Sequence, residues 1–132
     1  MRPATPNAKR VLIAGCGDLG LRVARLLALE NTTNQSWGLR RHPELEPANN
    51  ISRLTWIAAD LTQPETLLDL PKDITHVLYT VAPKARTEPD YRAVYRDGLE
   101  RLLYAVASPA LQRVLFVSST AVYGDHGAQW ID

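Results

Sequence analysis

The sequence predicts an α/β fold with a doubly wound parallel sheet, and three observations carry that prediction. Short apolar runs alternate along the chain with segments of helical periodicity, which is the pattern of repeated βαβ units. Three glycines, Gly15, Gly17 and Gly20, stand directly after the first apolar run and directly before a helical segment. The fourth apolar run is mostly free of polar residues, as expected for a strand that is covered on both faces.

Five strands are expected, at residues 10–14, 36–40, 54–58, 74–81 and 113–118. Residues 1–8 contain Pro3 and Pro6 and form a loose lead-in, so the domain itself occupies residues 9–132. Because connections between parallel strands are right-handed, the expected strand order is 3-2-1-4-5. This is the Rossmann-type arrangement, in which a ligand lies at the carboxyl ends of strands one and four, where the order reverses.

Helical periodicity and capping signals place three helices between the strands. The first covers residues 19–29, and its inward apolar face consists of Leu19, Val23, Leu26 and Leu27. A capping box at Thr62 and Glu65 starts a short helix that ends before Pro71. A third helix opens at residues 87–90, and its buried stripe consists of Tyr91, Val94, Tyr95, Gly98, Leu102 and Val106.

The glycine turn is the strongest functional signal in the chain. Glycines at the spacing of Gly15, Gly17 and Gly20 let the backbone turn tightly, approach a pyrophosphate and pack the next helix against the strand. The N-terminus of that helix, where Asp18 and Leu19 lie, has unpaired N–H groups and a partial positive charge. We therefore expect these five residues to bind a dinucleotide. The alternative is a glycine-rich turn that binds no ligand.

The end of the second strand predicts the kind of dinucleotide. A carboxylate at this place usually binds the ribose 2′-hydroxyl of NAD, but this chain carries Arg40 and Arg41. A guanidinium binds phosphate through two parallel hydrogen bonds, which favours NADP over NAD; a solvated basic pair is the alternative. Asp60 follows the third strand and precedes Leu61. Its carboxylate is expected either to bind the adenine amino group or only to start a loop.

A second motif follows the fifth strand and gives the chain a family resemblance. Residues 117–124 read Val-Ser-Ser-Thr-Ala-Val-Tyr-Gly. Together with the glycine turn, this motif resembles the extended and atypical short-chain dehydrogenase/reductases, the NAD-dependent epimerase/dehydratase group, from about Lys9 onward. The resemblance implies that Ser119 is catalytic and hydrogen-bonds a substrate oxygen beside the nicotinamide. It also implies that the cofactor runs along Val81, Ala82 and Pro83.

The chain departs from the family pattern in two places. The family often has an asparagine three residues before the helix glycine, where this chain has Tyr95. The family's general acid/base is a tyrosine with a lysine four residues later, whereas Tyr123 is followed at that spacing by Gly127. The resemblance therefore implies an NAD(P)-binding Rossmann domain truncated after strand five, without the proton donor or the substrate-binding part. We expect it to bind cofactor without turnover, and its uncovered apolar surface to favour a homo-oligomer.

Hydride transfer between a nicotinamide and a carbonyl or hydroxyl substrate is the function that the resemblance implies. The alternative is a non-catalytic dinucleotide-binding regulator or sensor, which needs no tyrosine–lysine pair. An S-adenosylmethionine-dependent methyltransferase is disfavoured, because Ile13 and Leu19 stand where that class carries an acidic residue and a glycine. A serine hydrolase is disfavoured because Ser119 is not in a Gly-x-Ser-x-Gly turn.

The composition of the chain disfavours several other classes. With 132 residues, 45% hydrophobic residues and a net charge of +1, it has no electrostatic reason to bind nucleic acid or a membrane surface. Its apolar runs are too short to span a bilayer, and its single cysteine, Cys16, excludes an intrachain disulfide, so a cytoplasmic location is expected. His42, His76 and His126 lack metal-ligand spacing, and His76 is expected to be structural.

Overall fold

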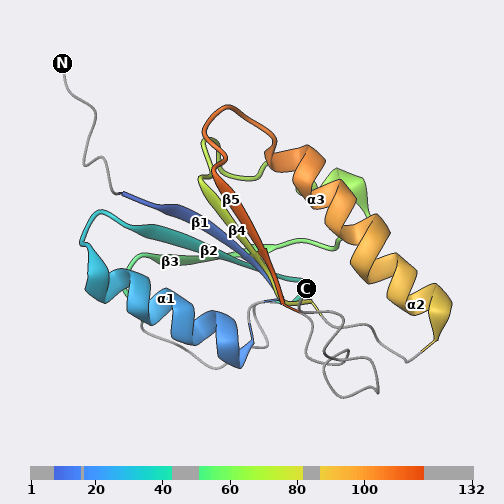
Figure 1. Ribbon diagram of the computed structural model, residues 1–132, viewed down its shortest axis with the longest axis horizontal. Helices are drawn as coiled ribbons and strands as arrows, with labels where there is room; N and C mark the ends of the chain where they lie inside the picture. The colour runs from blue at the N-terminus through green and yellow to red at the C-terminus, as the bar shows by residue number, and fades with distance from the viewer. Residues whose placement is uncertain (1–7, 16, 43–50, 82–86, 118–132) are drawn as a thin grey trace.

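Five parallel strands form one sheet in the order β3-β2-β1-β4-β5, which confirms the predicted fold class and strand order (Figure 1). The structure is a computed structural model, and it describes residues 8–15, 17–42, 51–81 and 87–117. The strands are β1 Arg10–Ala14, β2 Gln35–Arg40, β3 Leu54–Ala58, β4 His76–Tyr79 and β5 Arg113–Phe116.

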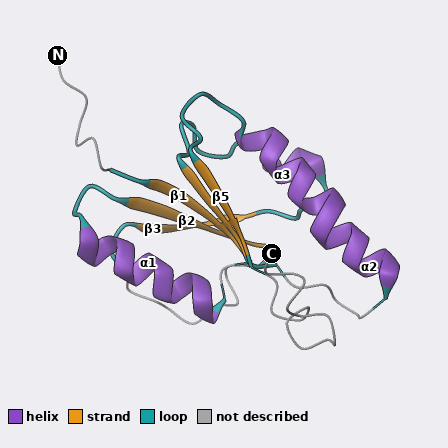
Figure 2. Ribbon diagram, in the orientation of Figure 1, coloured by secondary structure: helices purple, strands orange, loops and turns teal. Residues whose placement is uncertain are grey.

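Helices cover both faces of the sheet, as Figure 2 shows. Helix α1 (Asp18–Glu30) lies on one face, and α2 (Glu88–Arg92), the π-helical turn η3 (Ala93–Gly98) and α3 (Leu99–Val106) follow one another on the other. Alternate residues of β1 point to the two opposite faces of the sheet and contact the helices on each face. Val11 packs in a cluster with Ala24 of α1, whereas Leu12 packs in a cluster with Leu102 of α3. The parallel sheet is therefore buried from both sides at its centre.

Helix α1 faces the sheet only partly as predicted, with Val23 and Leu27 packed against the core cluster of Val11 and Ala24. The predicted face is wrong at Leu19 and Leu26, whose exposed fractions are 45% and 65%. The buried residues are Gly20 and Ala24, which have little or no side chain. Because small residues occupy the centre of the contact, the helix backbone can lie close to the sheet, and Leu19 and Leu26 turn outward.

The predicted capping box at Thr62 is also wrong. The short element is a 3₁₀-helix, η2 (Pro64–Leu67), and its N-cap residue is Gln63. The Thr62 hydroxyl instead donates to a carboxylate oxygen of Asp60 at 2.7 Å. The Asp60 turn therefore uses the hydroxyl that the capping box would have needed.

The helical segment after β4 begins as predicted. Thr87 is its N-cap residue, and its hydroxyl accepts a hydrogen bond from Asp90 N. The predicted stripe faces the sheet: Gly98, Leu102 and Val106 are buried, and Tyr91, Val94 and Tyr95 are half-buried. The π-helical turn η3 in its middle was not predicted.

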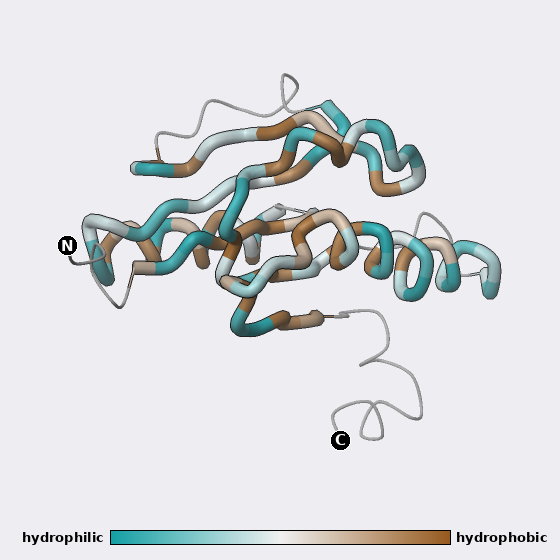
Figure 3. The backbone as a smooth tube through the Cα atoms, turned by 90° about the horizontal axis from the view of Figure 1, so that it is seen from above, coloured by the Kyte–Doolittle hydropathy of each residue, from teal (hydrophilic) through white to brown (hydrophobic). Residues whose placement is uncertain are grey.

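Strands β4 and β5 are shorter than the predicted ranges 74–81 and 113–118, although backbone pairing continues past their ends. Thr80 N donates to Ala14 O, and Val117 N donates to Tyr79 O, each at 2.9 Å. Strand β5 lies at the edge of the sheet, where Figure 3 shows its hydrophobic residues. All four of its residues are exposed.

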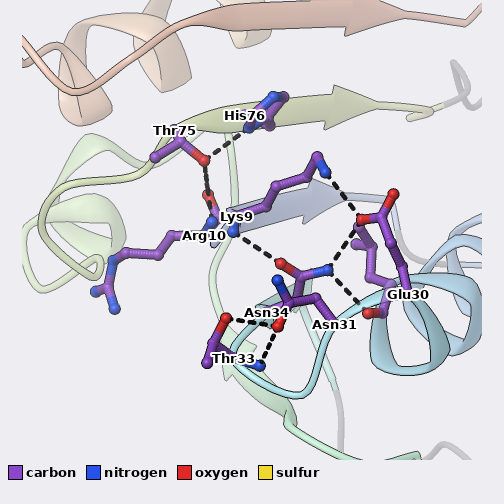
Figure 4. A network of polar contacts seen from close by, with 9 residues as sticks. Lys9, Arg10, Glu30, Asn31, Thr33, Asn34, Thr75 and His76 are labelled. Atoms are coloured by element: carbon purple, nitrogen blue, oxygen red, sulfur yellow. Dashed lines mark hydrogen bonds and ion pairs between the residues drawn. The ribbon is translucent and has the colours of Figure 1, made fainter. Parts of the chain in front are cut away.

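The amino ends of the strands are joined by a polar network (Figure 4). Asn34 is buried; its side chain accepts a bond from Lys9 N and donates to Leu27 O and Glu30 Oε1. Lys9 Nζ also lies 2.8 Å from Glu30 Oε1. At the start of β4, the Thr75 hydroxyl lies 2.6 Å from His76 Nδ1, which is consistent with a structural role for His76.

Candidate cofactor-binding site

The turn after β1 requires a glycine at position 15. Gly15 has a φ of +77°, a conformation that L side chains rarely adopt. A Cβ there would lie 2.8 Å from the Cα of Val81, closer than atoms can approach. The Thr80 hydroxyl donates to Gly15 O at 2.7 Å, and Gly17 N donates to the same oxygen at 2.6 Å. The turn is therefore held directly against the chain that leaves β4.

Gly17 has open space beside it. It is the N-cap residue of α1, and a Cβ there would have Gly15 O, at 3.9 Å, as its nearest neighbour. Glycine brings no side chain to cap the first-turn N–H groups of α1, which begins at Asp18. The Asp18 carboxylate is exposed and pairs with Arg22 at 3.4 Å. This end of the helix can therefore receive an anion through its backbone.

A cavity of about 530 Å³ opens at the carboxyl ends of the strands. Seven of the predicted binding residues line it: Gly15, Gly17, Arg40, Arg41, Asp60, Leu61 and Val81. Asp18, Leu19 and Gly20 form the first turn of α1, next to the lining residue Gly17. Ala82, Pro83 and Ser119 lie outside the described residues.

Two arginines lie on the β2 side of this cavity. Arg40 is the last residue of β2, pairs in register with Ala58 and is half-buried, and Arg41 follows it and is exposed. Carboxylates of the cavity lining come from Asp60 and Asp90, not from the end of β2. The local charge at the end of β2 is therefore positive, which suits a phosphate group there.

Asp60 starts a turn, as one of the two expectations for it had it. Its carboxylate accepts bonds from Thr62 N at 2.9 Å and from the Thr62 hydroxyl, so it does start a turn. It also lines the cavity together with Leu61. Its place in the turn fixes the carboxylate at the cavity wall.

The opposite wall includes residues that sequence reasoning missed. Asp90, Ala93 and Val94 line the cavity from α2 and η3, and Tyr79 lines it from the last position of β4. Tyr79 is fully buried, and its hydroxyl donates to Val94 O at 2.6 Å. Burial, with a smaller effect of Tyr95, raises the pKa of the Tyr79 phenol, which therefore stays protonated and remains a donor. The sequence signal that could have identified Tyr79 was its polar hydroxyl group within an otherwise apolar run.

The residues of the cavity fit a dinucleotide on four counts. The space beside Gly17 is open, the backbone of α1 begins there, and the cavity volume lies in the range of small-molecule sites. The cavity also lies at the ends of β1 and β4, where the strand order reverses.

Within the described ranges, no helix is long and apolar enough to cross a membrane. The same ranges contain no group of three or more histidine, cysteine, aspartate or glutamate residues that could hold a metal ion.

Comparisons with known proteins identify the family. A family model for the NAD dependent epimerase/dehydratase family matches residues 11–131. The fold is similar to that of Pen from Bacillus thuringiensis, with a TM-score of 0.65, 18% identity, and coverage of 93% of this chain and 42% of that chain. For vestitone reductase from alfalfa (Medicago sativa), the TM-score is 0.64 at 20% identity, covering 89% of this chain and 38% of that one. No curated protein sequence matches the chain.

A mutant of uronate dehydrogenase from Agrobacterium tumefaciens, complexed with NAD, also has a similar fold. Its TM-score is 0.62 at 20% identity, covering 89% of this chain and 43% of that one. The chain thus spans about two fifths of the length of these three proteins. The family match supports a dinucleotide as the cofactor. Since the family model covers nearly the whole sequence and the fold agrees with it, the chain belongs to the NAD-dependent epimerase/dehydratase family.

Proposed function

We propose that this chain binds a nicotinamide dinucleotide, with NADP preferred over NAD, and supplies the cofactor-binding part of an oxidoreductase. The observation that carries the proposal is a single cavity that joins the glycine turn to Arg40 and Arg41. NADP carries negative charge on its pyrophosphate and on its 2′-phosphate. The start of a helix suits the pyrophosphate, and the basic end of a strand suits the 2′-phosphate.

Each part of the cavity has a distinct role in this proposal. Gly17 and the first turn of α1 bind the pyrophosphate through backbone N–H groups. Arg40 and Arg41 bind the 2′-phosphate, and Asp60 and Leu61 contact the adenine. In the oxidoreductase to which this part belongs, the bound nicotinamide would supply hydride transfer to or from a carbonyl or hydroxyl substrate. Ser119, by family resemblance, donates a hydrogen bond to the substrate oxygen.

The proposal is tested by calorimetric titration of the chain with NADPH and NADH. A charge-assisted hydrogen bond to phosphate contributes about 1.5–3 kcal/mol, so NADPH should bind roughly tenfold more tightly or better. The variants Arg40→Ala and Arg41→Ala should each lose part of that preference, mainly through weaker NADPH binding.

Arg113→Ala is the matched control for charge. Arg113 begins β5, at the opposite end of the sheet from the cavity, and is exposed. The control should keep the parent preference. Equal affinity of the parent for both cofactors would refute the NADP preference, and no binding of either by the folded chain would refute the cofactor proposal.

A further inference from the structure

The Tyr79 hydroxyl reaches from the sheet into the helical layer. Tyr79 ends β4, and its hydroxyl donates at 2.6 Å to the carbonyl of Val94, a residue of the π-helical turn η3. The ring is stacked on Phe116 of β5, with the ring centroids 5.9 Å apart and an angle of 15° between the planes. The strands therefore hold the ring in place, and the hydroxyl holds the turn.

Gly98 leaves the space that this contact needs. A Cβ at position 98 would lie 2.9 Å from the Tyr79 hydroxyl oxygen, 3.1 Å from Ala93 O and 3.5 Å from the Cβ of Leu61. A Cβ there would press on the Tyr79 hydroxyl and on the Ala93 carbonyl of the turn, while its distance to Leu61 is that of an ordinary van der Waals contact. Tyr79 and Gly98 therefore act as a fitted pair.

A π-helical turn contains an extra residue, and here it shapes a wall of the cavity. Ala93 and Val94 of the turn line the cavity, as do Asp60 and Leu61 after β3. Arg101 of α3 donates to Leu61 O at 3.0 Å, which ties the helix to the loop after β3. The position of the turn therefore sets the space between Val94 and Leu61.

We propose that Tyr79 is a positioning residue for the cofactor: its hydroxyl holds the turn Ala93–Gly98 so that the cavity has the width of an adenosine moiety. This inference rests on the proposed function, since it assigns the adenosine end of the cofactor to the space between Val94 and Leu61. The hydroxyl acts through the Val94 carbonyl and not through contact with reacting atoms.

Tyr79→Phe tests the role of the hydroxyl while keeping the ring against Phe116. The probes are 2′,5′-ADP, which represents the adenosine end, and NADPH, both titrated into the 132-residue chain. The affinities for both should fall by a similar factor, on the order of fivefold, because the loss arises at the end that the two ligands share.

Two controls separate positioning from general stability. Tyr104→Phe removes a hydroxyl from a tyrosine on α3 that is 88% exposed, and should change neither affinity. Asn34→Ala destabilises the opposite end of the sheet and should lower the thermal midpoint without the loss of affinity. The loss of affinity for the two ligands in Tyr79→Phe must exceed the loss in either control variant.

Gly98→Ala tests whether the space at Gly98 is needed for the Tyr79 hydroxyl. The substitution should weaken 2′,5′-ADP binding more in the parent than in Tyr79→Phe, by a coupling of at least threefold, since only the parent has the hydroxyl at 2.9 Å. If the folded parent binds and Tyr79→Phe binds both ligands within twofold of it, the inference fails and the proposed function stands. Equal effects of Gly98→Ala in both backgrounds would also overturn the inference. If the folded parent binds neither ligand, both fail.

Discussion

The Thr80 hydroxyl donates a 2.7 Å hydrogen bond to the carbonyl of Gly15, and this contact joins the end of β4 to the turn after β1. Thr80 N also donates to Ala14 O at 2.9 Å, so the backbone pairing runs up to the turn. The two central strands thus build the floor of the cavity together. This explains why the glycine motif constrains both the fold and the binding site.

Gly15→Ala should destabilise the chain strongly. A positive φ costs a non-glycine residue about 1–2 kcal/mol, and the 2.8 Å approach to Val81 adds an overpacking cost of about 1–3 kcal/mol. Urea unfolding should therefore show a loss of about 2–5 kcal/mol. Gly17→Ala, at a φ of −94° with no close neighbour, is the control and should cost much less. Similar losses for the two variants would contradict this account of the turn.

Asn34→Ala should cost about 2–3 kcal/mol of unfolding free energy, since it removes three hydrogen bonds of a buried side chain and leaves Lys9 N without the Asn34 acceptor. The side-chain amide of Asn34 forms hydrogen bonds with Lys9 N, Leu27 O and Glu30 Oε1, as Figure 4 shows in part. Asn31→Ala removes a nearby half-buried amide whose described hydrogen bonds are local, to Thr33, and should cost less than about 1 kcal/mol. Equal urea midpoints for the two variants would show that the network contributes little.

His76 should make the fold less stable at mildly acidic pH. Burial lowers the pKa of His76 from its ordinary value of 6.5, and repulsion from Lys9 and Arg113 lowers it further. As the pH falls below 6.5, the unfolded chain takes up the proton first, so the unfolding free energy declines until the folded-state pKa is passed. His76→Asn should flatten this decline when urea unfolding is measured from pH 7 to about pH 5. An unchanged slope would remove His76 as the cause.

The exposed edge strand should promote self-association. Leu115 of β5 has an exposed fraction of 52% and lies in an edge strand of the sheet that the described residues form. Leu115→Lys should lower the weight-average mass at high protein concentration in sedimentation equilibrium. Leu26→Lys, at a leucine of 65% exposure on α1, is the control and should leave the mass unchanged. The opposite ranking would assign association to the helix face.

The strand order and the glycine turn could be predicted because their signals are local. Apolar runs, helical periodicity and the right-handed crossover rule together leave few possible topologies. The inward face of α1 could not be predicted from apolar residues alone. The close approach of the helix to the sheet selected Gly20 and Ala24 for the interface and left Leu26 outside.

The π-helical turn could not be predicted because its partner comes from another element. The Tyr79 hydroxyl bonds Val94, fifteen positions later in the sequence, across the interface between sheet and helix. The capping box failed for a local reason, since Asp60, two residues earlier, accepts the hydrogen bond of the Thr62 hydroxyl. The local sequence allowed two competing turns there, and the capping signal alone did not decide between them.

The most direct test of the cofactor site is the affinity of Gly17→Val for NADPH, compared with the parent chain by calorimetric titration. Gly17 has open space that a side chain would fill, at the point where the pyrophosphate must approach the start of α1. The account predicts saturable one-to-one binding by the parent and at least tenfold weaker binding by the variant, with circular dichroism confirming that both are folded. Equal affinities for the two folded proteins, or no binding by the parent, would contradict the assignment of the cofactor to this cavity.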